Sequence, residues 1–360
     1  MPNPDASAPS VSATATPTTV SRRRFLGSAL VAAPLLALPT TAAQRPTTSP
    51  SLNLGELTDS AARVIALDPR FEALVPKGAA ITRLQTGSTW SEGPAWSAAG
   101  RYLVWSDVPN NRQWRWLEED GHVSEFRNPS NNTNGSTFDA QGRMICCQQI
   151  GRRVVRFEAD GSETVLANHI DGMPFNSPND VVVHPDGSVW FTDPGYGVPK
   201  PLPQREAIYR IDPVKGETRR VDATLAKPNG LCFSPNFDRL YVADTGLGPD
   251  NALFEFTVTS DGGLKDSRSF ARIEFNGLPA GPDGQQVDRE GNVWASAGHG
   301  PDGVNGVHVF APDGKLIGVI LLPETCANVC FGGTGRNRLF MTATTSLYVI
   351  DTGTRGAHGS

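Results

Sequence analysis

Five polar side chains recur at one register along the chain, each four positions before an apolar residue. They are Glu92, Asn134, Asn179, Asn229 and Asp283. A sixth segment has Ala327 at this register, with Asn328 beside it. Carboxylate and amide oxygens are the ligands that Ca²⁺ prefers, usually about six to eight of them. These residue types therefore predict a site for one hard cation, provided that the fold brings them together.

Three further carboxylates are those of Asp107, Asp193 and Asp244. Each is the last residue of a second predicted strand, which follows the strand that one of the five polar residues begins. Because an antiparallel pair returns the chain to its starting side, we expect them near the same face. Two carboxylates with neutral amides would balance one divalent ion, whereas many carboxylates would raise one another's pKa by repulsion. Asn, Asp and Gly also form tight turns where strands begin, so the pattern alone allows a purely structural role.

The elements that must position these residues form a repeat. Six copies begin roughly every 40 to 55 residues, a period typical of stacked β-sheet repeats. The copies are Glu92–Asp107, Asn134–Gln148, Asn179–Asp193, Asn229–Asp244, Asp283–Ser296 and Ala327–Ala343. Each contains a strand, a tight turn and a second strand rich in Val, Leu, Trp or Tyr, and a further hairpin usually follows. The pattern predicts four strands in each copy.

Four-stranded sheets at this period, without a long helix-period segment among them, predict an all-β fold. We expect a six-bladed β-propeller with four-stranded antiparallel blades around a central channel. The last copy ends early, at Ser346–Ile350, so the segment around Ile81–Gln85 should supply its missing strand and close the ring. The first strand of each blade lines the channel, so the five polar residues should converge on one mouth.

The N-terminal part of the chain predicts export. Ser21–Leu26 is a twin-arginine pattern, the apolar run from Phe25 to Leu38 is too short to span a bilayer, and small residues follow at 41–43. We therefore predict a twin-arginine signal peptide with an N-terminal extension (1–43), a linker and short N-terminal segment (44–67), the propeller (68–352) and a tail (353–360). The twin-arginine export machinery would deliver a periplasmic or secreted protein that has no membrane attachment after cleavage.

The composition of the chain argues against several classes of binding partner and of active site. Charged residues make up 19% of the chain and the net charge is −5, so the basic footprint of a nucleic-acid-binding protein is missing. Five cysteines without a CxxC pair predict buried thiols, although Cys326 and Cys330 could pair in an oxidising compartment. The sequence has no GxSxG nucleophile motif. We expect Tyr196 to wall a pocket at the mouth, and His299 to face it and assist proton transfer.

Several motifs together resemble a known family. They are "WSEGPAW" (Trp90–Trp96), "TNGSTFD" (Thr133–Asp139), "SPNDVVVHPDGSVWFTDPGYG" (Ser177–Gly197), "KPNGLCFSP" (Lys227–Pro235), "LYVADTG" (Leu240–Gly246) and "VCFGG" (Val329–Gly333). From about Asp68 to Ile350 the chain resembles the gluconolactonase and senescence-marker-protein family, also called regucalcin-like. The resemblance implies a calcium-dependent propeller that hydrolyses lactones, a carboxylic ester hydrolase.

The resemblance also implies roles for single residues. Matched by motif, the metal ligands fall on Glu92, Asn179 and Asp244, and Asp244 is also the implied general base. Asn134 matches a position close to the substrate, and Asn229 and Asp283 are ranked second, as substrate-binding residues. Asn132 stands where sugar-lactone hydrolases of the family often have an Arg, so the preferred lactone stays open.

The implied chemistry is hydrolysis of a small-molecule lactone such as glucono-1,5-lactone. Ca²⁺, or another divalent cation such as Zn²⁺, Mg²⁺ or Mn²⁺, would polarise the carbonyl, and water would attack it. Two alternatives stay open on the sequence. The same centre could hydrolyse aryl esters or organophosphates, or the propeller could bind a ligand without catalysis.

Overall fold

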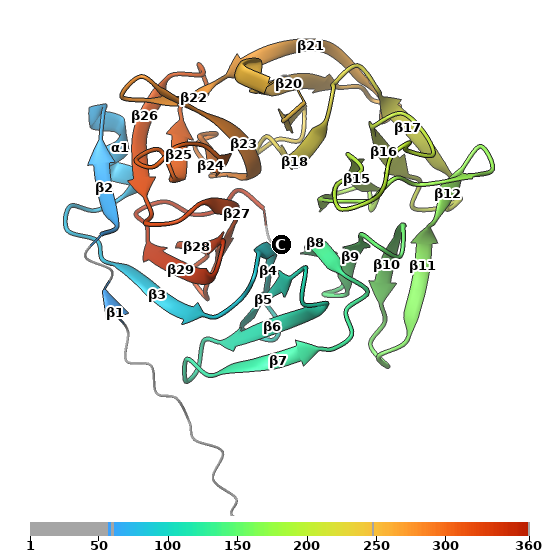
Figure 1. The fold of residues 1–360 in the computed structure, drawn as a ribbon, viewed down its shortest axis with the longest axis horizontal. Helices are drawn as coiled ribbons and strands as arrows, with labels where there is room; N and C mark the ends of the chain where they lie inside the picture. Colours follow the sequence, from blue (N-terminus) through green and yellow to red (C-terminus); the bar gives the residue numbers. More distant parts are fainter. Residues whose placement is uncertain (1–56, 59–60, 247, 359–360) are drawn as a thin grey trace, which may run out of the picture. The chain divides into compact units, whose positions relative to one another are not determined.

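The computed structural model describes residues 57–58, 61–246 and 248–358 of the 360-residue chain. In this part, six sheets of four or more strands surround a common axis (Figure 1), which confirms the six-bladed β-propeller. The predicted signal peptide and most of the predicted linker lie outside the described residues. Among the described residues, no helix combines the length and the apolar character that crossing a membrane requires.

Blades one to four follow one another along the chain, with the innermost strand first. Blade one contains β4 (Ser91–Ser97), β5 (Tyr102–Asp107), β6 (Arg112–Leu117) and β7 (Val123–Arg127). Blade two contains β8 (Thr133–Phe138), β9 (Met144–Gln148), β10 (Arg153–Phe157) and β11 (Glu163–Ala167). Blade three contains β14 (Val181–Val183), β15 (Val189–Asp193), β16 (Ala207–Ile211) and β17 (Thr218–Asp222). Blade four contains β18 (Pro228–Phe233), β19 (Arg239–Asp244), β20 (Ala252–Val258) and β21 (Leu264–Ala271).

Blades five and six include strands from the N-terminal segment. Blade five contains β22 (Ile273–Phe275), β23 (Leu278–Val287), β24 (Val293–His299), β25 (Gly306–Phe310) and β26 (Leu316–Leu321), with β2 (Arg63–Ala66) at its outer edge. Blade six contains β27 (Cys326–Gly332), β28 (Arg338–Ala343), β29 (Ser346–Asp351), β3 (Ile81–Thr86) and β1 (Leu57–Thr58). Ile81 of β3 lies opposite Ile350 of β29, which confirms the predicted closure of the ring.

A few short elements complete the described structure. They are α1 (Pro69–Leu74), the 3₁₀ turn η1 (Gly248–Asp250) and the hairpin of β12 (His169–Ile170) and β13 (Met173–Pro174). The Asp68 side chain accepts the Arg70 N–H at the start of α1, and Pro69 occupies the first turn, where no N–H is needed. Buried Phe71 of α1 packs near Trp294 of blade five, with ring centroids 6.3 Å apart.

The hydrophobic core lies between neighbouring blades. Trp96 of blade one stacks on Phe340 of blade six at 6.0 Å between ring centroids, and Trp190 of blade three meets Phe233 of blade four at 5.5 Å. Burial of such large rings stabilises the contact between sheets by the hydrophobic effect. The five cysteines, Cys326 and Cys330 included, are buried.

The C-terminal tail crosses the ends of the innermost strands at one end of the axis. The Ala357 N–H donates to Val287 O at the end of β23, and Gly356 forms a bridge with Asp288. His358 Nε2 donates to Ser234 O (3.0 Å), just after β18 ends. The tail therefore links blades five and four where their innermost strands end.

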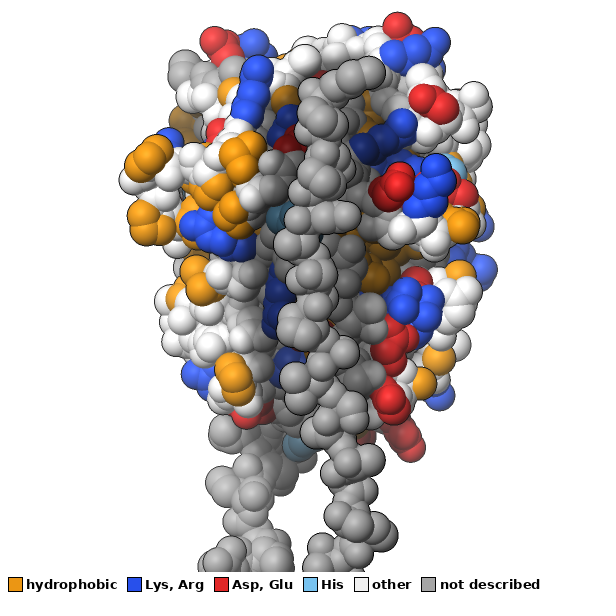
Figure 2. Space-filling model, turned by 90° about the vertical axis from the view of Figure 1, so that its right-hand side faces the viewer, with side chains coloured by type: hydrophobic (Ala, Val, Ile, Leu, Met, Phe, Trp, Pro, Cys, Tyr) orange, Lys and Arg blue, Asp and Glu red, His pale blue; other side chains and the backbone are white. Residues whose placement is uncertain are grey.

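The outer surface mixes charges of both signs. On the side shown in Figure 2, Lys and Arg side chains lie beside Asp and Glu side chains, outside the atoms drawn in grey. Exposed ion pairs, such as Arg272–Asp250 (2.9 Å), bring opposite charges together on the surface of the protein.

Candidate active site

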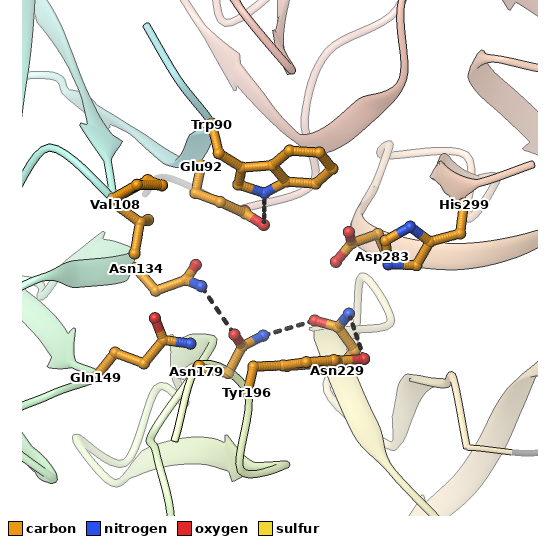
Figure 3. A pocket seen from close by; sticks show the side chains of 12 residues that line it. Trp90, Glu92, Val108, Asn134, Gln149, Asn179, Tyr196, Asn229, Asp283 and His299 are labelled. Carbon is orange, nitrogen blue, oxygen red and sulfur yellow. Dashed lines mark hydrogen bonds between the residues drawn. The ribbon is translucent and has the colours of Figure 1, made fainter. Parts of the chain in front are cut away.

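The five residues that share one register come together where the innermost strands begin (Figure 3). Glu92, Asn134, Asn179, Asn229 and Asp283 are each 4–6% exposed and line one cavity of about 230 Å³. This end of the axis is opposite to the one that the C-terminal tail crosses, because the tail contacts the same strands where they end. The convergence predicted from the repeat is therefore confirmed.

Irregular strand pairing occurs beside four of these five side chains, whereas Asn179 lies just before β14, where no shift occurs. The register of the innermost strand shifts between Glu92 and Ala95 in β4, and equivalent shifts occur in β8, β18, β23 and β27. Such bulges re-aim a side chain and are common beside functional sites. Gly93 follows Glu92 at a φ of +46°, and a Cβ there would lie 2.0 Å from Asn134 O. Only glycine permits this close approach of neighbouring strands.

Three amides form a directed chain of hydrogen bonds. Asn134 Nδ2 donates to Asn179 Oδ1 (2.9 Å), and Asn179 Nδ2 donates to Asn229 Oδ1 (2.5 Å). Asn229 Nδ2 then donates to the Tyr196 hydroxyl (3.5 Å), which is hydrogen-bonded to Thr245. Since every amide donates in the same sense, Asn134 Oδ1 is left at the start of the chain, buried and without a partner. An unpaired buried acceptor is costly, so it marks a position where a ligand can bind.

Two carboxylates face the cavity beside these amides. Burial raises the pKa of Glu92 to about 7, and hydrogen bonds from Trp90 Nε1 (3.2 Å) and the Gly93 N–H (3.2 Å) offset only part of this shift. Burial also raises the pKa of Asp283, and the negative charge of Glu92 adds to the shift. The groups that lower these pKa values are hydrogen-bond donors rather than cations, so the negative charge of the pair is poorly compensated.

A second layer of buried side chains, here called the floor, lies next to the cavity residues and consists of Asp180 and Asn328. Asp180 follows Asn179 in blade three, and Asn328 follows Ala327 in blade six. The other four blades have glycine at this position. Asn328 Oδ1 accepts the Val329 N–H (2.8 Å), which turns its amide nitrogen toward the carboxylates. Hydrogen bonding to the Asn328 side chain lowers the pKa of both Glu92 and Asp180, although burial raises each of them overall. Asn328 therefore ties the floor to Glu92.

The walls of the cavity come from loops between the strands. As expected, Tyr196 and His299 both line it. Sequence reasoning missed the remaining wall residues, which are Trp90, Val108, Pro109, Gln149 and Gly197. Trp90 could have been predicted as a wall residue, because it lies two positions before Glu92 in the loop that leads to β4. One wall is thus apolar and the other is formed by amides and the Tyr196 phenol.

The structure does not place Asp244 with the cavity residues, contrary to the expected geometry. Its carboxylate accepts the N–H groups of Ala226 (2.8 Å), Lys227 (2.8 Å) and Gly246 (3.0 Å). Asp107 and Asp193 bind backbone N–H groups of the equivalent loops in blades one and three. These aspartates hold the loop that leads to the ring residue of their own blade, and all three are buried. Asp283 instead supplies the second carboxylate of the cavity.

Asn132 is also held away from the cavity wall. It adopts a positive φ of +50°, which Asn tolerates better than most residues. Its Nδ2 donates to Val108 O (2.8 Å). The side chain that replaces the family's frequent Arg therefore braces a loop of blade one instead of lining the cavity.

The fold and the site together define a six-bladed propeller with a polar cavity at one end of its axis. Residues 90–345 match the family described as SMP-30/Gluconolactonase/LRE-like region, and the chain belongs to this family. The resemblance seen in the sequence motifs is thereby confirmed.

Individual relatives agree with this assignment. The chain is 30% identical to the gluconolactonase of Zymomonas mobilis, over 94% of this chain and 99% of the relative. Its structure is similar to that of a gluconolactonase from Xanthomonas campestris, with a TM-score of 0.72 and 37% identity over 80% of this chain and 94% of that one. It is also similar to regucalcin from Agrobacterium tumefaciens, a calcium-binding protein (TM-score 0.63, 20% identity, 76% and 94% covered), a likeness that shows the fold alone.

Proposed function

We propose that this protein hydrolyses the ester bond of a sugar lactone in the cavity at the mouth of the propeller, with a divalent cation held beside the substrate. The observation that carries the proposal is the buried pair of Glu92 and Asp283 next to the unpaired acceptor Asn134 Oδ1. The kinship with a gluconolactonase along almost the whole chain supports the choice of substrate.

The donor set fits a hard divalent cation. Two carboxylates would compensate the charge of the ion, and the amide oxygens of the ring would add neutral ligands, a combination that suits Ca²⁺, Mg²⁺ or Mn²⁺ better than a soft metal. The described residues contain no cluster of three or more His, Cys, Asp or Glu side chains placed to bind a metal, so such a site would depend on the amides. We propose Glu92 and Asp283 as its charged ligands, with Asp283 taking the place expected for Asp244.

The cation, when bound, would supply Lewis-acid polarisation of the lactone carbonyl. The remaining tasks fall to side chains of this chain. Asn134 and Asn179 can bind hydroxyl groups of the sugar ring, and the apolar wall of Trp90, Val108 and Pro109 can cover its less polar face. The cavity is smaller than the roughly 300–1,000 Å³ of pockets for drug-sized ligands, which favours a single sugar ring.

Export completes the proposal. The twin-arginine pattern in residues 21–26 supports action outside the cytoplasm, on lactones in the periplasm or the medium. Fractionation of cells that produce the full chain would test it, and mature protein retained in the cytoplasm would contradict it.

The activity is tested on the mature protein after chelation and reloading with Ca²⁺, Mg²⁺, Mn²⁺ or Zn²⁺. We expect acid release from D-glucono-1,5-lactone above the spontaneous rate only with a cation, and one binding event by calorimetry. Asp283→Asn should lose this binding while staying folded, and the exposed Asp266→Asn should keep it. Full activity in the metal-free protein would contradict the proposed requirement for a cation. Turnover of aryl esters or organophosphates, with no lactone hydrolysed, would overturn the substrate class.

A further inference from the structure

We propose that His299 is a catalytic residue, whose imidazole takes the proton of the attacking water and returns it to the ring oxygen of the lactone. The inference rests on the proposed lactone hydrolysis and adds the group that moves the proton. A general base placed in this way typically contributes about 10²–10⁴-fold to the rate.

The position of His299 supports this role. It is the last residue of β24 and pairs with Gly281 of β23, two positions before Asp283. Its side chain lines the same cavity as Glu92 and Asp283, and Figure 3 shows the ring on the Asp283 side of that cavity. The residue is exposed at the mouth, so the ring can reach both solvent and substrate.

Trp90 provides a platform for the imidazole. The two rings stack with centroids 6.2 Å apart and an interplanar angle of 26°. The indole Nε1 of Trp90 donates to Glu92 Oε1 (3.2 Å), so the platform is itself attached to the ring of polar residues. This contact restricts the imidazole to the cavity wall, as a group that must transfer a proton in a defined direction requires.

The other cavity residues are poorly suited to accept a proton. The amides of Asn134, Asn179, Asn229 and Gln149 are not bases at neutral pH. Burial raises the pKa of the Tyr196 phenol far above its ordinary value of 10.0, so it stays protonated. Asp244 is engaged by three backbone N–H groups, and Glu92 and Asp283 are the proposed cation ligands.

His299 has the acid–base properties that the step needs. Partial burial and the positive charge of Lys227 both hold its pKa below the ordinary 6.5, so the ring is neutral and able to accept a proton at pH 7. Lys227, just before β18, is the charged group that acts on the His299 pKa, and Glu92 of β4 and Asp283 of β23 line the same cavity.

The step balances without a further reactant. The water oxygen bonds to the carbonyl carbon while its proton moves to an imidazole nitrogen. The bond from the carbonyl carbon to the ring oxygen then breaks, and that oxygen takes the proton from the imidazolium. The product is a hydroxy acid, whose carboxyl group releases its proton to the solvent at neutral pH. One water is consumed and nothing is oxidised or reduced.

The experiment compares His299→Gln, His299→Ala and the wild-type protein, each saturated with cation, from about pH 5.5 to pH 8. His122→Gln is the matched control, because His122 is an exposed histidine in the loop between β6 and β7, outside the cavity. We expect kcat of both His299 variants to fall about 10²–10⁴-fold, with KM changed only a few-fold and the acid limb of the wild-type profile lost. Added imidazole should restore part of the activity of His299→Ala, and His122→Gln should match the wild type.

Three results would overturn the role of His299. They are a kcat within threefold of the wild type, a loss confined to KM with an unchanged acid limb, and a cation affinity that falls more than tenfold, which would make His299 a ligand. A wild-type protein that binds cation but hydrolyses no lactone would instead refute the proposed function, so the two failures can be told apart.

Discussion

Glu92→Gln should stabilise the cation-free protein at alkaline pH, although it alters the proposed active site. The pKa of Glu92 rises from an ordinary 4.5 to about 7 in the folded protein because the carboxyl group is buried. Between these values the folded state keeps a proton that the unfolded state has lost, so stability falls with rising pH by about 1.4 kcal/mol per pH unit. The stability is complete below pH 4.5 and is lost by about pH 7, a total of about 3 kcal/mol.

A glutamine has no proton to lose and escapes this penalty. In chelator, we expect Glu92→Gln to melt about 6 °C above the wild type at pH 8 and close to it at pH 5, since about 2 °C corresponds to 1 kcal/mol in a domain of this size. With saturating cation the order should reverse, because the wild type gains binding energy that the variant lacks. Differential scanning calorimetry at both pH values, with and without cation, measures the cost of the buried charge and the stabilisation by the cation separately.

The matched control is Glu274→Gln, which removes an exposed carboxylate on β22 and should follow the wild type at every pH. Equal melting temperatures of Glu92→Gln and the wild type in chelator at pH 8 would refute the burial argument. A variant that is stabilised by cation as strongly as the wild type would remove Glu92 from the proposed ligands.

Two further variants test how the site is held. Asp244→Asn weakens the acceptor of three backbone N–H groups and should lower the free energy of unfolding by about 1–3 kcal/mol. At low temperature its kcat should stay within twofold of the wild type. A loss of activity at unchanged stability would indicate instead that Asp244 takes part in catalysis. Asn328→Ala removes a buried amide that binds Glu92 and leaves the Val329 N–H without its acceptor. It should weaken cation affinity about tenfold by calorimetry and lower the stability of the cation-free protein by about 1–3 kcal/mol, and an unchanged cation affinity would contradict a role of Asn328 in holding Glu92.

The architecture could be predicted because its signals are local. Turn residues and alternating apolar positions define each strand pair, and six copies of one pattern define the blades. The closing strand was also predictable, because the last copy ended early and a β-like segment preceded the first, as the pairing of Ile81 with Ile350 shows. The convergence of the five ring residues then followed from the geometry of a propeller.

The walls and the floor of the cavity could not be predicted in the same way. Trp90, Val108 and Gln149 lie in loops whose path depends on contacts between blades, which no local pattern records. The carboxylates that Asn328 binds, those of Glu92 and Asp180, are far from it in sequence, and four glycines let the innermost strands approach one another at the axis.

Asp244 shows why a repeat pattern alone does not separate a carboxylate that holds a loop from one that lines a cavity. Both registers vary among the blades. The inner register has Asn in three copies, and the end of the second strand has Asp in blades one, three and four. The contacts of the side chains separate them. Each aspartate at a strand end binds the backbone of its own loop, whereas the carboxylates of Glu92 and Asp283 line the cavity. These contacts depend on how the blades meet, so the structure rather than the repeat favours Asp283 over Asp244 in the proposed cation site.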